Sequence, residues 1–209
     1  MQMDWKTNMA ELGGAFMVSL LVLAELPDVD ADGVATGDLL IAGLLLAVAM
    51  AAMAGAHILP MFTWISAMTG DLQDTDAWMN NGMRLVFQVI GAAVAIMVMT
   101  HGGEIGPDYV AQEMWEFEMW SAVGMVAGGA LLWTVYSRCD AWVTAMAVMA
   151  LVAMAGATAA VDFGGASDMG AALLNSGDAD MVASLANWVA NGALAGIGAM
   201  VATKVPDMV

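Results

Sequence analysis

Residues 55–68 read Gly-Ala-His-Ile-Leu-Pro-Met-Phe-Thr-Trp-Ile-Ser-Ala-Met, an apolar stretch interrupted by one proline. It is too short to cross a bilayer, whose core takes about 20 apolar residues of helix. Residues 164–175 read Gly-Gly-Ala-Ser-Asp-Met-Gly-Ala-Ala-Leu-Leu-Asn, a second short apolar stretch. Segments of this length are typical of re-entrant half-helices. Their unpaired backbone N–H and C=O groups are tolerated at membrane depth only where protein or a water-filled cavity supplies hydrogen-bond partners.

Longer apolar segments surround these two stretches, and clusters of polar and turn-forming residues separate them. The first also resembles a signal peptide, but Glu11 and Glu25 bracket it and no clear cleavage site follows, so we interpret it as a retained span. The sequence therefore predicts six transmembrane helices, at Ala10–Leu26, Leu39–Ala56, Met83–Thr100, Met119–Tyr136, Ala141–Ala160 and Val182–Thr203.

The composition supports a membrane protein. Hydrophobic residues make up 61% of the 209 residues and charged residues only 12%, which argues against a soluble globular enzyme and against disorder. Acids outnumber bases by 21 to 4, and so few bases exclude a nucleic-acid partner. The single cysteine excludes an intrachain disulfide and a zinc site built from several cysteines. No catalytic or cofactor-binding motif is present, so we expect no enzymatic activity, no cofactor and no metal.

The distribution of charge predicts the topology. With six spans and a cytoplasmic N-terminus, the four bases Lys6, Arg84, Arg138 and Lys204 all fall on the cytoplasmic side, as the positive-inside rule requires. We therefore expect a multi-pass protein of the cell membrane with both termini in the cytoplasm. Most acids fall in the outer loops. They serve either solvation in salty water or a cation-attracting vestibule, and we favour solvation because Asp28 and Asp30 lie far from any predicted pore mouth.

The two short stretches also predict an internal repeat. Their Gly-Ala pairs, at positions 55 and 165, lie 110 residues apart, about half of the chain. Three spans plus one half-helix in each half are typical of an inverted repeat. We therefore expect one all-α transmembrane domain over residues 1–209, with a first repeat at 1–105 and a second at 106–209.

Residues 55–63, Gly-Ala-His-Ile-Leu-Pro-Met-Phe-Thr, resemble the first pore loop of the aquaporin and glycerol-facilitator family, Gly-Ala-His-x-Asn-Pro-Ala-Val-Thr. Further segments resemble other motifs of that family, in the same order along nearly the whole chain: Ala10–Phe16, Gln88–Ala92, Gly165–Ser167 and Trp188–Ala190. The resemblance implies six tilted spans, two half-helices that meet at the bilayer centre, and a homotetramer. It also implies passive transport of small neutral solutes such as water, glycerol, urea or dissolved gas.

The sequence departs from the family at the residues that line its pore. Leu59 replaces the asparagine of the first motif, and the family's second motif, Asn-Pro-Ala-Arg, reads Met169-Gly170-Ala171-Ala172 here. These replacements predict a wide, apolar outer filter and an apolar mid-pore, and a hydrophobic constriction also gates by dewetting. The residues expected to line the pore are His57, Leu59, Pro60, Met61, Met169, Gly170, Ala171 and Ala172, with Leu39 and Ala157 placed at the constriction by spacing.

Several polar residues fall within or beside these apolar segments. An intramembrane carboxylate is a functional candidate by default, and the resemblance implies that Glu11 holds the first re-entrant loop, although a proton or cation path or a helix end is also possible. Glu118 is the best match for its partner in the second half, with Glu116 close behind. His57 either lines the pore mouth or is structural.

The last candidate site is acidic. Asp168 stands just before the expected second half-helix, where it either caps the helix or, with Asp162, attracts cations. A cation channel, a non-conducting relative and an intramembrane enzyme or cofactor protein therefore remain as alternatives to a neutral-solute channel.

Overall fold

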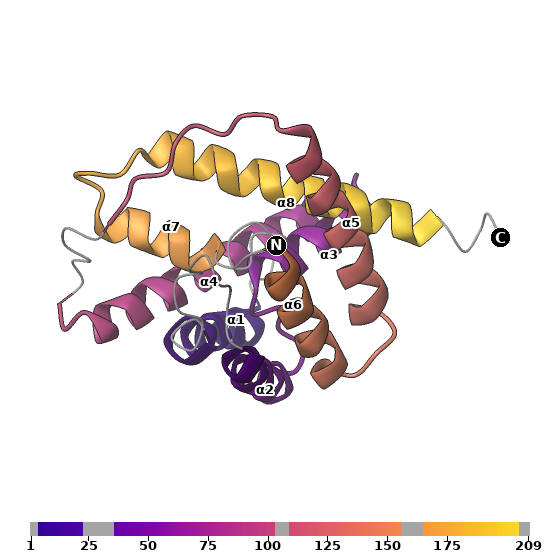
Figure 1. Cartoon of the computed structure of the whole chain (residues 1–209), viewed down its shortest axis with the longest axis horizontal. Helices are drawn as coiled ribbons and strands as arrows, with labels where there is room; N and C mark the ends of the chain where they lie inside the picture. Colours follow the sequence, from indigo (N-terminus) through magenta and orange to yellow (C-terminus); the bar gives the residue numbers. More distant parts are fainter. Residues whose placement is uncertain (1–3, 23–35, 103–108, 156–164, 205–209) are drawn as a thin grey trace.

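The computed structural model describes residues 4–22, 36–102, 109–155 and 165–204. These residues form eight α-helices, and none of them forms a strand, which confirms the all-α class. The helices are α1 (Trp5–Met17), α2 (Thr36–Ala52), α3 (Pro60–Thr69), α4 (Thr75–Met99), α5 (Met119–Tyr136), α6 (Ala141–Ala155), α7 (Gly165–Leu174) and α8 (Met181–Lys204), and α1 continues into a π-helix at Val18–Val22 (Figure 1).

Three of the described helices, α4, α5 and α8, are long and apolar enough to cross a membrane. Helices α2 and α6 are apolar but shorter. Large apolar side chains are exposed on the long helices, including Val98 of α4 and Val123 of α5, which are each 53% exposed. Exposed apolar side chains on long apolar helices suggest a multi-pass membrane protein. The expected spans 10–26 and 141–160 both extend beyond the described residues.

Two helices are only ten residues long, and they lie at the two short apolar stretches. Helix α3 begins at Pro60, because the proline ring fixes φ and lacks the N–H that a first helical residue leaves unpaired. Its N-cap, Leu59, is extended and offers no capping side chain. Helix α7 has no such proline and begins at Gly165.

The helices pack in pairs that join distant parts of the chain. Helix α1 packs on α4 and α5 packs on α8, while α2 packs on α6. The short helix α3 packs on α8, α7 packs on α4, and the two short helices contact each other. In Figure 1, α4 ends and α8 begins on the left, whereas α8 ends on the right, on the side of the turn between α5 and α6.

Glycines allow the closest helix pairs to form. A Cβ at Gly91 of α4 would overlap the backbone carbonyl of Leu12 in α1, and one at Gly198 of α8 would overlap the carbonyl of Val126 in α5. Small residues at such crossings let two backbones approach closely, which is a common way to join helices inside a membrane.

Asp4 begins α1 as its N-cap. Its carboxylate accepts hydrogen bonds from the Thr7 backbone N–H and the Thr7 hydroxyl, at 3.1 and 2.6 Å. These bonds hold the pKa of Asp4 below its usual value, and the bond from the Thr7 hydroxyl has the larger effect.

Candidate functional site

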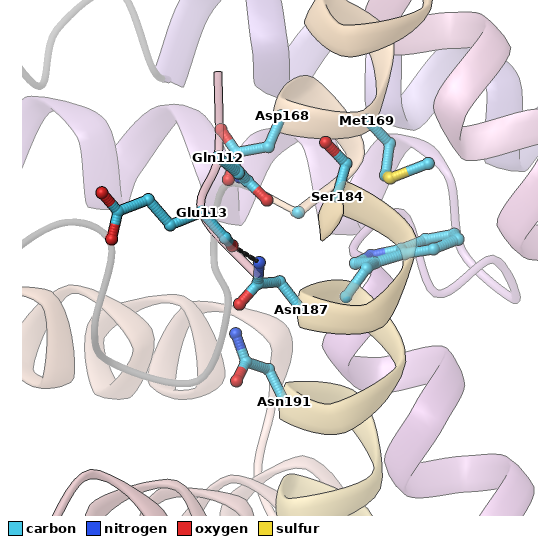
Figure 2. Close-up of a pocket in the computed structure, with 9 residues that line it drawn as sticks. Gln112, Glu113, Asp168, Met169, Ser184, Asn187 and Asn191 are labelled. Atoms are coloured by element: carbon cyan, nitrogen blue, oxygen red, sulfur yellow. Dashed lines mark hydrogen bonds between the residues drawn. The ribbon is translucent and has the colours of Figure 1, made fainter. Parts of the chain in front are cut away.

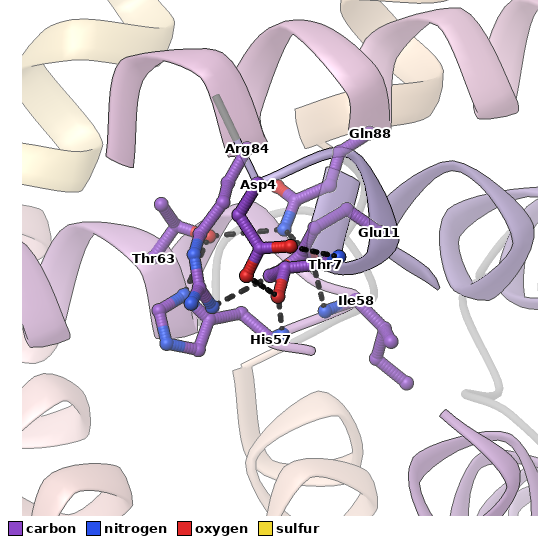
Figure 3. A network of polar contacts seen from close by, with 8 residues as sticks. All are labelled: Asp4, Thr7, Glu11, His57, Ile58, Thr63, Arg84 and Gln88. Carbon is purple, nitrogen blue, oxygen red and sulfur yellow. Dashed lines mark hydrogen bonds and ion pairs between the residues drawn. The ribbon is translucent and has the colours of Figure 1, made fainter. Parts of the chain in front are cut away.

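A fully buried carboxylate, Glu11 of α1, organises the turn that precedes α3 (Figure 3). Its two oxygens accept backbone hydrogen bonds from His57 and Ile58, both at 2.8 Å. They also accept from the Arg84 guanidinium at 3.0 Å and from the Gln88 side-chain amide at 2.7 Å, both on α4. One carboxylate therefore connects α1, α4 and the turn before α3.

The backbone of this turn is strained. Ile58 has φ of +58°, a left-handed conformation that is unusual for a β-branched residue. Gly55 has φ of +93°, which glycine adopts without penalty. Because Glu11 binds the N–H groups of both His57 and Ile58, it holds the turn in a conformation that the local sequence disfavours.

His57 is part of the same network. It is buried, its Nδ1 lies 3.1 Å from the Thr63 hydroxyl, and its ring meets the Tyr136 ring edge-on. The Gln88 amide also donates to the Thr63 hydroxyl, at 2.9 Å, while the buried Gln88 carbonyl oxygen has no partner in the part of the chain that the structure describes. The backbone N–H and the Nδ1 atom of His57 thus both bond to protein groups, Glu11 and Thr63.

The other predicted pore residues of the first half are apolar and buried. Leu59 and Met61 are 2% and 1% exposed, and Leu39 packs partly buried against the same cluster. Pro60 is the first residue of α3. We name the tightly packed group around them the central apolar cluster; its largest fully buried members are Leu46, Ile58, Leu59, Met61, Phe62, Ile65, Leu132 and Met149.

The second motif does not stand where the sequence placed it. Met169 to Ala172 lie in the middle of α7 rather than at its start, because no proline delays the helix and it begins four residues earlier. Gly170 packs on α4, where a Cβ would lie 2.9 Å from the Ala93 nitrogen, so it serves helix contact. Met169 and Ala172 are buried and Ala171 is partly buried.

Asp168, Ala157 and Asp162 are the other residues predicted near the second half-helix. The expectation that Asp168 precedes the half-helix is wrong, because Asp168 lies within the first turn of α7. Ala157 and Asp162 lie outside the described residues.

The structure places Glu118 at the start of a helix, and its role in holding the second loop stays a prediction. It is the N-cap of α5, where its exposed carboxylate accepts from the backbone N–H groups of Trp120 and Ser121. Among the described residues Glu118 holds the start of its own helix and bonds no part of α7. Position in the chain explains the difference, because Glu11 lies inside α1 whereas Glu118 stands before α5.

A polar cavity of about 340 Å³ lies between α7 and α8, and sequence reasoning missed it (Figure 2). We name it the α7–α8 cavity; its lining residues are Gln112, Glu113, Gly165, Asp168, Met169, Ser184, Asn187, Trp188 and Asn191. The Asn187 amide donates to the Glu113 backbone carbonyl at 2.7 Å, which ties the segment before α5 to α8.

Helical spacing in the sequence could have predicted both the partners of Glu11 and the polar side of the α7–α8 cavity. Arg84 and Gln88 lie four residues apart on α4, so both reach Glu11 from one helix face. Ser184, Asn187 and Asn191 follow at intervals of three and four on the otherwise apolar α8, which puts them on one side. Polar residues at this spacing in an apolar segment predict a polar face inside the bundle.

No known protein family matches the chain, and no curated protein matches it either.

Proposed function

We propose that this chain is a membrane channel of aquaporin-like architecture, with six spans and two re-entrant half-helices, that passes small neutral solutes. The helix pairing supports the inverted repeat. Exchanging the first four helices with the last four converts the α1–α4 pair into the α5–α8 pair and the α3–α8 pair into the α7–α4 pair, and it leaves the α2–α6 pair unchanged.

The lengths of α3 and α7 are the strongest support for this proposal. A ten-residue helix is about 15 Å long, and a bilayer core is about 30 Å thick. Each short helix therefore reaches about halfway, and the two contact each other. Half-helices that meet inside a membrane are typical of proteins that form a solute pathway at the repeat interface.

The central apolar cluster supports a neutral permeant. Leu59 and Met61, at the start of α3, belong to it together with side chains of α2, α5, α6 and α8. An ion that enters apolar surroundings loses its hydration at a far larger cost in free energy than a small neutral molecule does. An apolar constriction of this kind also opens and closes by wetting and dewetting. The cluster is thus a gate in the proposed pathway.

Truncating Met61 to alanine is expected to open this gate. In proteoliposomes, Met61→Ala should raise the stopped-flow permeability to water, glycerol or urea several-fold above that of the wild type, without an ionic current. Met154→Ala is the matched control, because Met154 is 84% exposed on α6 and its truncation leaves the cluster intact. Thermal unfolding of each variant checks the fold, since truncating a buried methionine costs about 2–5 kcal/mol.

The close packing of the same cluster favours a second candidate, a non-conducting relative. This second candidate would be supported if proteoliposomes with folded wild-type protein or folded Met61→Ala showed no higher permeability to any solute than protein-free liposomes. A cation current through the wild type would contradict both candidates.

The single cysteine tests the proposed topology. Cys139 is free and exposed in the turn between α5 and α6, which the six-span topology puts in the cytoplasm. A membrane-impermeant maleimide should label it in inside-out vesicles and leave it unlabelled in intact cells. In a Cys139→Ser background, Gly177→Cys should show the reverse, because Gly177 is exposed in the turn between α7 and α8. Labelling of both positions from the same side would contradict six spans.

A further inference from the structure

The α7–α8 cavity contains buried polar groups that lack partners. Ser184 is only 2% exposed, and among the described residues neither its hydroxyl nor the buried Trp188 indole N–H has a hydrogen-bond partner. Figure 2 shows Ser184 on the side of α8 that faces Asp168 of α7. Because an unpaired buried polar group is costly, these groups indicate that the cavity holds a polar occupant.

The cavity also has a distinct charge. The Asp168 carboxylate lines it, and none of the described residues gives that carboxylate a hydrogen bond or an ion pair. The Glu113 carboxylate extends away from Asp168 in Figure 2, and no described lining residue is a Lys, Arg or His. A partly buried carboxylate without a cationic partner is unfavourable, so an occupant with positive charge would stabilise it.

We propose that the α7–α8 cavity binds one partly hydrated monovalent cation, with Asp168 as its anionic ligand. The remaining lining groups supply hard oxygen donors: the Ser184 hydroxyl and the side-chain amide oxygens of Gln112, Asn187 and Asn191. Hard oxygen donors suit hard cations such as Na⁺, and the charge of one carboxylate balances a single positive charge.

The hydration of the ion follows from the unpartnered donor. The Trp188 N–H cannot bind a cation and needs an acceptor, which the oxygen of a cation-bound water supplies. A cavity of about 340 Å³ has room for an ion with several waters, since a water occupies about 30 Å³ in the liquid. This site lies apart from the central apolar cluster and does not depend on the proposed transport function.

Thermal unfolding of the purified full-length protein tests the proposal. At constant ionic strength, replacing N-methylglucamine chloride with NaCl should raise the melting temperature of the wild type by several degrees, in a saturable way. Asp168→Asn should abolish this response. It should also unfold at a higher temperature than the wild type when Na⁺ is absent, because it removes an uncompensated charge.

Two further variants and a direct measurement complete the experiment. Asp178→Asn, which changes an exposed acid in the turn after α7, should keep the full response to Na⁺. Ser184→Ala should weaken it, and ²³Na NMR lines should broaden with the wild type but not with Asp168→Asn. Equal melting temperatures in both salts, an equal loss in Asp178→Asn, or saturation by Ca²⁺ at far lower concentration than by Na⁺ would each overturn the proposal.

Discussion

Glu11→Gln is expected to lower the free energy of unfolding by about 3–5 kcal/mol, the usual cost of breaking a buried ion pair by removing one partner. Four donors converge on this carboxylate: the backbone N–H groups of His57 and Ile58, and the side chains of Arg84 and Gln88. A glutamine there accepts through one oxygen only, and its own amide group would face donors. The turn before α3 would lose the bonds that hold Ile58 in its strained conformation.

Chemical or thermal unfolding in detergent measures this loss, and Glu118→Gln is the matched control. Glu118 is an exposed N-cap, so its replacement should cost no more than about 1 kcal/mol. A double-mutant cycle with Arg84→Met should show coupling, because the Arg84–Glu11 ion pair is part of what Glu11→Gln removes. Equal losses for Glu11→Gln and Glu118→Gln would contradict the prediction that the buried carboxylate contributes far more to stability than the exposed one.

Gly198→Ala and Gly129→Ala are expected to have the other large effect. A Cβ at Gly198 would overlap the Val126 carbonyl, and one at Gly129 would overlap the Ala195 carbonyl. Both obstacles are backbone atoms of the partner helix, which cannot rotate away, so α5 and α8 must separate. Overpacking costs about 1–3 kcal/mol even where side chains can adjust, and we expect these backbone overlaps to reach at least the top of that range.

The control for these variants lies on α5, the helix that contains Gly129. Gly124 is exposed in α5 and nothing lies within 4 Å of a Cβ built there. Gly124→Ala should therefore leave stability unchanged or raise it by up to about 1 kcal/mol, because alanine favours a helix over glycine. Unfolding measurements on the three variants, with the yield of monodisperse protein, check the prediction. Wild-type stability in Gly198→Ala would show that α5 and α8 do not cross so closely.

Much of the secondary structure was predictable because it rests on local properties. Long apolar segments between polar clusters predicted both ends of α5 and α8, and the end of α4, to within one residue. The start of α4 was the exception, because Thr75 lies eight residues before the predicted Met83. The start of α3 at Pro60 has a local cause too, since a proline acts on its own residue and on the one before it. Without such a residue, the start of α7 was placed too late, and Asp168 was assigned outside the helix.

The candidate sites depended on contacts that no local pattern encodes. Arg84 looked like a marker of the cytoplasmic side, yet it pairs with Glu11, 73 positions away. Glu118 looked like the counterpart of Glu11 until the structure put it at a helix end.

By itself, the sequence determined an all-α chain of apolar helices with two short helices at the Gly-Ala pairs, because hydropathy, length and proline act within a few residues. Only the tertiary structure decided which polar groups are buried together. A carboxylate such as Glu11 is stable in the interior only where donors from distant segments meet it. The unpartnered Ser184 and Trp188 in the α7–α8 cavity likewise became visible only once α7 was packed beside α8.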